Sequence, residues 1–275
     1  MIRILCGIAG ALCLLMCISQ KYFSQKEDSV QQYFTEPVQQ NVSPSEESDL
    51  DEGEKEPTEP VEQEEPEPYV SPVDFESLHA INEDVYAWLS IPGTEISYPV
   101  LQHPEDDTYY LYRNLYGESD SNGAIYTEAS YSNKDFTDPV TIIYGHNMRN
   151  GKMFGTLQNT YSSKEALEEF SEIIIYLPDR ELHYTVFAAV PFDKRHILYN
   201  YDFTDQRTFR LFFQEILSVR ALEAVFADDT TIQTDDRVLI LSTCLIGNRD
   251  KRFLVCGKLS ETIPTNTTEQ NGGQN

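Results

Sequence analysis

Short runs of apolar or alternating residues, separated by turn residues, extend along the chain from residue 73 to residue 259. Runs of this length and alternation are typical of β-strands. The segment Pro178-Asp179-Arg180 is a tight turn that predicts a hairpin between two of them. At this spacing, seven or eight short strands predict a mainly β domain, either a closed barrel or a sandwich. The predicted strands are 96–101, 124–127, 140–144, 172–177, 182–190, 237–243 and 252–259.

Two other segments have apolar residues at steps of three and four, which is typical of amphipathic helices. The first spans residues 75–89 and is expected to end at Ile91-Pro92-Gly93. The second follows a capping residue, Thr204 or Asp205, and continues to Arg220 with four phenylalanine or isoleucine side chains on one side. We expect this second helix to cover one end of the sheet.

The N-terminal residues 4–18 are apolar without a break and lie between Arg3 and Lys21. This length fits the apolar region of a cleaved signal peptide and is shorter than the ~20 residues of a usual membrane span. No small-x-small cleavage site follows Ile18, which favours an uncleaved anchor over residues 1–22. On that interpretation the protein is held in the cell membrane by a single N-terminal helix. The positive-inside rule then makes the rest of the chain extracellular.

The formal net charge is −26, and residues 24–72 contribute half of it through 15 acidic residues and two lysines. Because this segment is rich in Glu, Pro, Gln and Ser, residues 23–72 are expected to form a disordered stalk. Residues 263–275 are expected to be a disordered polar tail, which leaves 73–262 as the folded domain. The acid excess argues against a nucleic-acid partner, because phosphate binding needs clustered Lys and Arg.

Only two of the five cysteines, Cys244 and Cys256, lie outside the N-terminal apolar run. Two such cysteines would by default form a disulfide in an extracellular domain. If the last two strands pair as a hairpin, however, Cys244 lies near Arg252 and Cys256 lies opposite Ile240. The two cysteines are then about 13 Å apart, which is too far for a disulfide. Cys256 is expected in the core, whereas Cys244 is a free thiol that is either catalytic or inert.

A cysteine nucleophile needs a nearby base or positive charge to form its thiolate, and acyl transfer also needs a donor for the oxyanion. His146 follows a predicted strand and begins a loop, where side chains reach active sites, although a structural histidine would fit the same position. Arg252 shares a face with Cys244 in the predicted hairpin, unless it forms only a surface salt bridge. Arg249, in the turn, is a rival for its role. Neither a metal nor another cofactor is expected, because the chain has no Cys-x-x-Cys and no His pair at helical spacing.

The chain contains Leu241-Ser242-Thr243-Cys244, then Arg252 at the start of RFLVCGKL, and Tyr144-Gly145-His146 upstream. Taken together and in this order, these motifs resemble those of the sortases, which are cysteine transpeptidases of Gram-positive bacteria. The resemblance is to class B, and it extends over residues 73–259. Its other segments are 82–102, 109–114, 123–126 and 143–157.

The resemblance implies an eight-stranded β-barrel with N-terminal helices and one long helix before the last strand pair. It also implies Cys244 as the nucleophile, His146 as the proton-transfer partner and Arg252 as the oxyanion stabiliser, with Ser242 assisting. Leu245 stands where class B often has an acidic residue, so no role is assigned to it.

The partners implied are secreted proteins with a C-terminal sorting motif, which is cleaved through a thioester, and a cell-wall precursor amine that accepts the acyl group. The product is a protein anchored to peptidoglycan. A hydrolytic cysteine peptidase, a pilin-polymerising sortase and a non-catalytic envelope-binding module are the alternatives.

Overall fold

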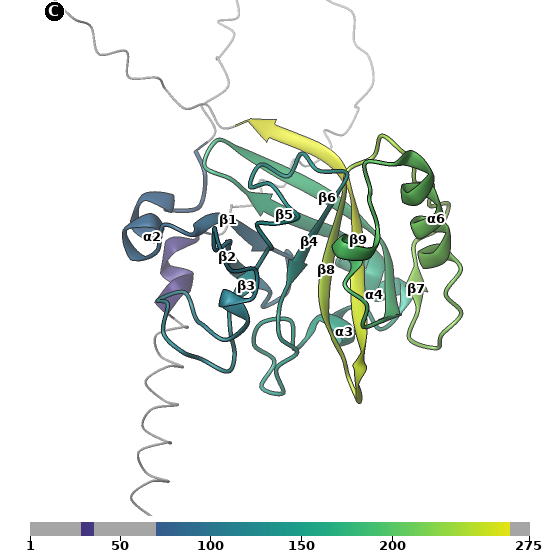
Figure 1. The fold of residues 1–275 in the computed structure, drawn as a ribbon, viewed down its shortest axis with the longest axis horizontal. Coiled ribbons are helices and arrows are strands. Elements are labelled where there is room, and N and C mark those ends of the chain that lie inside the picture. Colours follow the sequence, from purple (N-terminus) through teal and green to yellow (C-terminus); the bar gives the residue numbers. More distant parts are fainter. Residues whose placement is uncertain (1–28, 36–69, 265–275) are drawn as a thin grey trace, which may run out of the picture.

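The computed structural model describes residues 29–35 and 70–264, and these form a closed β-barrel with helices on its outside (Figure 1). The strands pair in the order β5-β1-β2-β3-β4-β8-β9-β6-β7, and β5 also pairs with β6. That extra pairing closes a ring of eight strands, and β7 lies outside the ring on β6. The expected eight-stranded barrel is therefore confirmed. The strands are β1 Val85–Ser90, β2 Ser97–Leu101, β3 Ile125–Tyr126, β4 Val140–Tyr144, β5 Glu172–Tyr176, β6 Arg180–Asp193, β7 Val225–Phe226, β8 Val238–Leu245 and β9 Asn248–Pro264.

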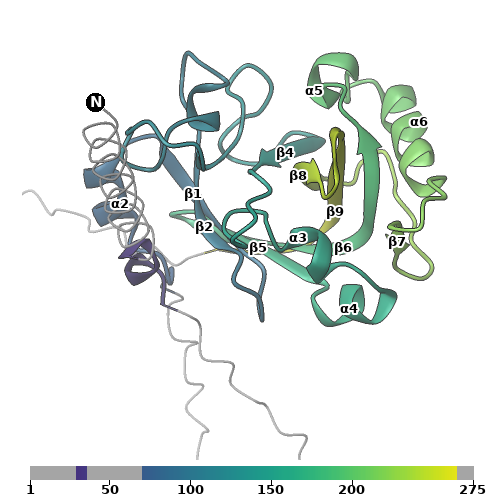
Figure 2. The ribbon, with the colours of Figure 1, turned by 90° about the horizontal axis from the view of Figure 1, so that it is seen from below.

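Figure 2 shows α5 and α6 on one side of the barrel, η1 and α2 on the opposite side, and α3 and α4 between them at the bottom of the view. The predicted long helix before the last strand pair is α6. Asp205 caps it by accepting hydrogen bonds from the amides of Arg207 (3.3 Å) and Thr208 (3.0 Å). The helices are η1 Ser29–Tyr33, α2 Phe75–Ile81, η2 Tyr109–Leu111, α3 Leu157–Thr160, α4 Lys164–Glu169, α5 Ile197–Asn200 and α6 Gln206–Leu217.

Alternation along the strands builds one core inside the barrel and others on its outer face, because successive side chains point to opposite faces of the barrel wall. Leu239, Leu241 and Val255 point into the barrel interior and are fully buried. Their neighbours on the outer face pack against α6, which contributes the buried residues Phe209, Phe212, Phe213 and Ile216. The outer face of β4, β8 and β9 is therefore a second core wherever α6 covers it.

The expected helix over residues 75–89 is wrong in its second half. The helix α2 ends at Ile81, Asn82 adopts an extended conformation, and Val85–Ser90 forms β1. Every residue of β1 is buried, and Trp88 and Leu89 are both fully buried. A strand with both faces buried has no polar positions to show its period, so a spacing of three and four arises by chance.

Part of the expected stalk is ordered. Within residues 29–35, Val30 is buried and the ring of Phe34 stacks on Trp88, with centroids 5.5 Å apart and planes 7° apart. Phe34 also forms an isolated β-bridge with Val73. Burial of these apolar side chains against β1 and β2 offsets the entropy cost of ordering the segment. Residues 36–69 and 265–275, which include most of the expected stalk and tail, lie outside the described residues.

The expected localisation needs a correction. Across residues 29–35 and 70–264, no helix has the length and apolar character that crossing a membrane requires. The longest of the described helices, α6, has 12 residues, against the ~20 of a usual span. This finding contradicts the assignment as a single-pass membrane protein with an extracellular domain, which we withdraw. Residues 1–22, which suggested it, lie outside the described residues.

Candidate active site

The outer face that α6 covers continues beyond the helix into an open cleft. Under α6, Ile142 of β4 lies beside Ile240 of β8, and Ile240 lies beside Cys256 of β9. All three side chains are fully buried. Further along the strands, beyond Ile142 on β4 and Ile240 on β8 and beyond Leu254 on β9, the same face presents side chains that line an open cleft.

The cleft begins where these side chains become polar. Tyr144 is paired with Ser242 between β4 and β8, and Cys244 is paired with Arg252 between β8 and β9. Because Ser242 and Cys244 are two and four residues beyond Ile240, they share its face. The cleft has a volume of about 260 Å³, and its lining includes these residues and His146. The structure therefore brings together the predicted site residues, which are His146, Ser242, Cys244 and Arg252.

Cys244 is a free thiol, as the predicted hairpin register implied. Its strand partner is Arg252, whereas Cys256 is the partner of Ile240, and neither cysteine is in a disulfide. Burial raises the pKa of the Cys256 thiol, which keeps that thiol protonated. Cys244 is only partly buried, and its carbonyl oxygen accepts a hydrogen bond from Asn147 Nδ2 at 2.7 Å. This bond ties the end of β8 to the loop after β4.

His146 lies two residues beyond the end of β4, at the strand-to-loop position that the sequence predicted. Its Nε2 lies 2.9 Å from the carbonyl oxygen of Leu111, which belongs to η2. A carbonyl oxygen only accepts hydrogen bonds, so Nε2 carries a proton and Nδ1 is the nitrogen left for chemistry. The backbone carbonyl of His146 also accepts from the Phe154 amide at 3.0 Å, which fixes the loop.

Arg252 has no carboxylate partner among residues 29–35 and 70–264. Its Nη1 donates to the carbonyl oxygens of Arg249 (3.2 Å) and Lys251 (3.3 Å). The neighbouring cations on the rim differ, because Lys194 pairs with Asp250 at 2.7 Å and Arg195 is held by Asp193 and Glu215. The guanidinium of Arg252 is therefore the one in this cleft whose charge is not balanced by a carboxylate. A simple surface salt bridge does not explain its position.

The cleft also contains residues that were not predicted as site residues, among them the ionisable side chains of Glu128, Tyr144 and His196. Glu128 Oε1 and His196 Nε2 are 2.9 Å apart, across 68 positions of sequence. Burial raises the pKa of Glu128, and His196 partly opposes that rise. Burial and the charge of Glu128 likewise raise the pKa of Tyr144. An acidic residue just after the short strand β3 was the available sequence signal.

Another histidine, His183, does not take part in the cleft. It lies on β6, where Nδ1 is 2.8 Å from Glu172 Oε1 and Nε2 is 3.0 Å from Glu181 Oε2. These two carboxylates raise its pKa to about 9. His183 does not line the cleft that contains Cys244, so its interactions are structural.

Comparisons with known proteins agree with this architecture. The family model for the sortase domain matches residues 89–260. Sortase B of Listeria monocytogenes is 30% identical over 171 residues, which cover 62% of this chain and 67% of that protein. The crystal structure of Staphylococcus aureus sortase B superposes with a TM-score of 0.60 at 26% identity, covering 70% of this chain and 89% of that one.

A class B sortase of Streptococcus pyogenes that is involved in pilus biogenesis is also similar. Its TM-score is 0.58 at 28% identity, and the match covers 68% of this chain and 98% of that one. The family model alone covers more than half of the present chain. The chain therefore belongs to the sortase family, as a class B sortase and hence a cysteine transpeptidase that anchors proteins to the cell wall.

Proposed function

We propose that Cys244, His146 and Arg252 carry out the transpeptidation in this cleft, with Ser242 in a supporting role. The observation that carries the proposal is the pairing of Cys244 with Arg252 across β8 and β9, in the cleft that His146 also lines. A thiol, an imidazole and a guanidinium without a carboxylate partner are the groups that acyl transfer through a thioester requires.

In the first half-reaction, the Cys244 thiolate attacks the carbonyl carbon of a peptide bond in the sorting motif, with the proton of the thiol held on His146. The carbonyl oxygen becomes an oxyanion, which the guanidinium of Arg252 stabilises. The carbon–nitrogen bond then breaks, and His146 gives its proton to the leaving amine. The product of this step is a thioester between the sorting motif and Cys244.

In the second half-reaction, the amine of a cell-wall precursor attacks the thioester carbon. His146 takes the proton that the amine loses as the new amide bond forms, and the carbon–sulfur bond breaks. The thiolate of Cys244 and the protonated imidazole are thereby restored. Arg252 stabilises the second oxyanion as it did the first, so one cleft serves both steps.

Ser242 lies on the same face as Cys244, two residues before it, and is buried in the wall of the cleft. Its carbonyl oxygen accepts from the Gly145 amide at 3.2 Å, which extends the β4–β8 ladder to the residue before His146. The hydroxyl supports the site by donating to the carbonyl of the bound peptide. This role is a positioning one, because the hydroxyl transfers no proton in the steps above.

The test is mass spectrometry of the products formed from a sorting peptide, with and without a small primary amine such as glycinamide. We expect an amide adduct when the amine is present, and a hydroxamate when hydroxylamine replaces it, because both intercept a thioester. If only the hydrolysed peptide forms at every amine concentration, the protein is a hydrolytic cysteine peptidase and the proposal is wrong.

Pilin polymerisation is the second candidate, because one similar structure is a class B sortase involved in pilus biogenesis. In that reaction the accepting amine would be a lysine side chain of another secreted protein. Competition between a folded lysine-bearing protein substrate and a cell-wall precursor peptide separates the two. Exclusive use of the protein lysine would favour pilin assembly.

A further inference from the structure

We propose that Gly123 is a positioning residue for the transpeptidation, because its lack of a side chain lets the carbonyl group of Leu111 lie where it holds the His146 imidazole. Gly123 lies two residues before β3 and does not line the cleft. This inference rests on the proposed function and deepens it, since it names what orients the proton-transfer group.

The carbonyl group of Leu111 is fixed by the two carbonyl groups beside it. The carbonyl oxygens of Tyr110 and Tyr112 accept hydrogen bonds from two amides of the segment 120–124, each at 2.9 Å. The carbonyl oxygen of Leu111, between them, accepts from Nε2 of His146 at 2.9 Å. The direction of this middle carbonyl is therefore set by the segment on which its neighbours are held.

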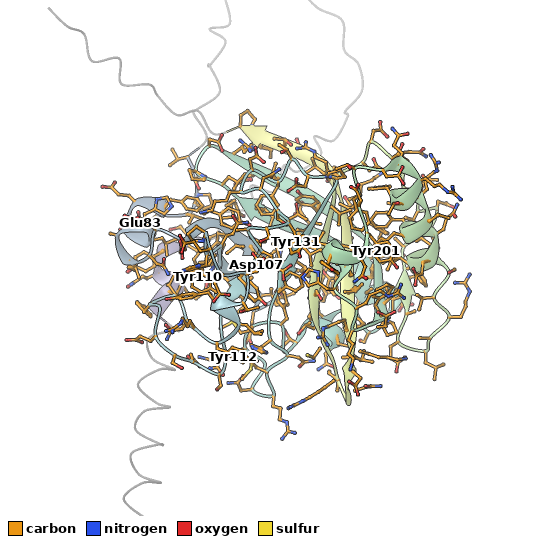
Figure 3. All side chains as sticks on the ribbon, in the orientation of Figure 1. Glu83, Asp107, Tyr110, Tyr112, Tyr131 and Tyr201 are labelled. Atoms are coloured by element: carbon orange, nitrogen blue, oxygen red, sulfur yellow. The ribbon has the colours of Figure 1, made fainter. Side chains whose placement is uncertain are left out.

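The same turn is anchored in the core of the protein. Tyr110, labelled in Figure 3, is 2% exposed, and its hydroxyl donates to Asp84 at 2.6 Å and accepts from Asn82 at 2.9 Å. Tyr112, also labelled in Figure 3, is 62% exposed. The chain thus leaves the core at Leu111, which lines the cleft. Because the turn is held from inside, its backbone cannot move freely when something presses on it.

Gly123 lies directly against these carbonyl groups. Its φ of +61° is in the left-handed region that favours glycine. A Cβ atom at this position would lie 2.6 Å from the carbonyl oxygen of Tyr110 and 2.8 Å from that of Leu111. Both distances are well below van der Waals contact, and both oxygens belong to backbone that is held on its other side. Any side chain at position 123 therefore displaces the carbonyl group that holds His146.

The hydrogen bond to Leu111 matters because the two nitrogens of His146 have different tasks. Nε2 keeps its proton on the carbonyl oxygen throughout the cycle, so Nδ1 is the nitrogen that takes and gives a proton. A backbone carbonyl thus serves as the third group that orients the base of a cysteine nucleophile. Such groups must be held within about 0.5 Å of their working position, so a small displacement of this carbonyl is costly.

The experiment compares Gly123→Ala with Gly117→Ala, its matched control in the same loop. Gly117 has a φ of +70°, so alanine is strained there too, but its Cβ would approach nothing closer than the Tyr109 hydroxyl at 3.6 Å. With the fluorogenic pentapeptide that the native protein cleaves best, Gly123→Ala should lower kcat by about 10–100-fold and change KM by less than about threefold. Gly117→Ala should change neither constant by more than about threefold. Equal losses in the two variants would overturn the inference.

Nuclear magnetic resonance of the protein labelled with ¹⁵N-histidine reports the His146 ring without any peptide. The signals of this ring are assigned by their loss in His146→Gln. We expect a one-bond proton–nitrogen cross-peak for Nε2, because the hydrogen bond slows exchange of its proton with water. The cross-peak should vanish in Gly123→Ala and remain in Gly117→Ala. A native ring without a proton on Nε2, or an unchanged cross-peak in Gly123→Ala, would overturn the inference.

A double variant separates positioning through His146 from a purely structural role. Gly123→Ala should slow the alkylation of Cys244 by iodoacetamide about 3–10-fold, because the proton of the thiol is held on His146. In a His146→Gln background the same change should have no further effect, since the ring through which it acts is gone. Equal slowing in both backgrounds would show a general disturbance of the fold and overturn the inference.

A second variant keeps the inference testable if Gly123→Ala does not fold. Incorporation of the α-hydroxy analogue of tyrosine at position 112 replaces the peptide bond after Leu111 by an ester, whose carbonyl oxygen is a weaker acceptor. This change leaves Gly123 in place and should lower kcat about 3–10-fold. An unchanged kcat would overturn the inference.

The measurements without peptide also distinguish this inference from the proposed function. If Gly123→Ala removes the Nε2 cross-peak but the native protein forms no amide adduct with any amine, Gly123 positions His146 and the proposed function is wrong. If the native protein forms the adduct and Gly123→Ala behaves as Gly117→Ala does, the inference alone is wrong.

Discussion

Cys244 and Cys256 lie on the same face of the barrel wall, yet they differ in burial and in the residues that surround them. Cys256 is fully buried under α6, and burial raises the pKa of its thiol. Cys244 is only partly buried, lies in a cleft, and is paired with Arg252. The two cysteines are four residue pairs apart along the hairpin, because Cys256 is paired with Ile240 and Cys244 with Arg252.

The difference teaches that the packing of α6 on the outer face of the barrel, rather than the type of residue on that face, separates the core from the site. Over Ile142 and Ile240 the helix α6 supplies phenylalanine rings, which exclude water. Over Ser242 and Cys244 there is no such helix, and the short α5 brings His196 to the rim instead. The strands continue unchanged from one region to the other, so the barrel holds the thiol rigidly while the uncovered face admits a peptide.

The largest expected effect is the loss of activity when Cys244, rather than Cys256, is replaced. Cys244→Ala is expected to lower transpeptidation by at least about 10⁴-fold, because no other group in the cleft can form the thioester. Cys256→Ala should keep the activity and lower the free energy of unfolding by about 1–2 kcal/mol, the cost of a small cavity. Product formation by mass spectrometry and urea unfolding measure the two effects.

Alkylation of the native protein followed by peptide mapping is the companion measurement. Iodoacetamide should modify the peptide with Cys244 and should reach Cys256 only after unfolding. Equal rates of modification at the two cysteines would contradict the difference in coverage.

The next effect concerns the cation that faces Cys244. Arg252→Ala is expected to lower kcat/KM by roughly 10²–10³-fold with the fold retained, as for loss of an oxyanion donor. Arg249→Ala is the matched control, because Arg249 lies three residues away in the same strand and does not line the cleft. Steady-state kinetics with a fluorogenic sorting peptide measure both variants. A large loss in Arg249→Ala and a small one in Arg252→Ala would assign the role to Arg249.

The parts of this molecule that follow from local pattern were predictable, and the parts that depend on distant contacts were not. The hairpin register placed Cys244 opposite Arg252 because the turn between β8 and β9 is short. The contact of Glu128 with His196 joins residues 68 positions apart, and no periodicity encodes such a contact. The same limit applies to Phe34, whose stacking on Trp88 requires a strand that the spacing of 75–89 had hidden.

A third region, near the opposite end of β6 from the cleft, sharpens the comparison, because a histidine there lies between two carboxylates. Glu172 and Glu181 raise the pKa of His183 to about 9, above the usual 6.5. The protonated ring therefore stabilises the fold fully below about pH 6.5, and this contribution is lost as the pH rises through about 9.

The variant His183→Gln should lower the free energy of unfolding by about 1–2 kcal/mol near pH 6 and by much less near pH 10. Urea unfolding of both proteins at the two pH values measures this difference, and activity at neutral pH should be unchanged. A difference in stability that stays constant between the two pH values would show that the carboxylates do not hold the proton.

The smallest expected effect tests how the open region stays ordered without a covering helix. Asn147 Nδ2 donates to the carbonyl oxygen of Cys244 at 2.7 Å, which ties the loop of His146 to the end of β8. In Asn147→Asp the side chain keeps its size but loses the donor, so kcat should fall about 3–10-fold while KM changes little. Asn150→Asp, an exposed residue of the same loop, is the matched control and should leave kcat unchanged. If both variants behave alike, the added charge and not the lost bond is responsible, and the loop and the strand end are ordered independently.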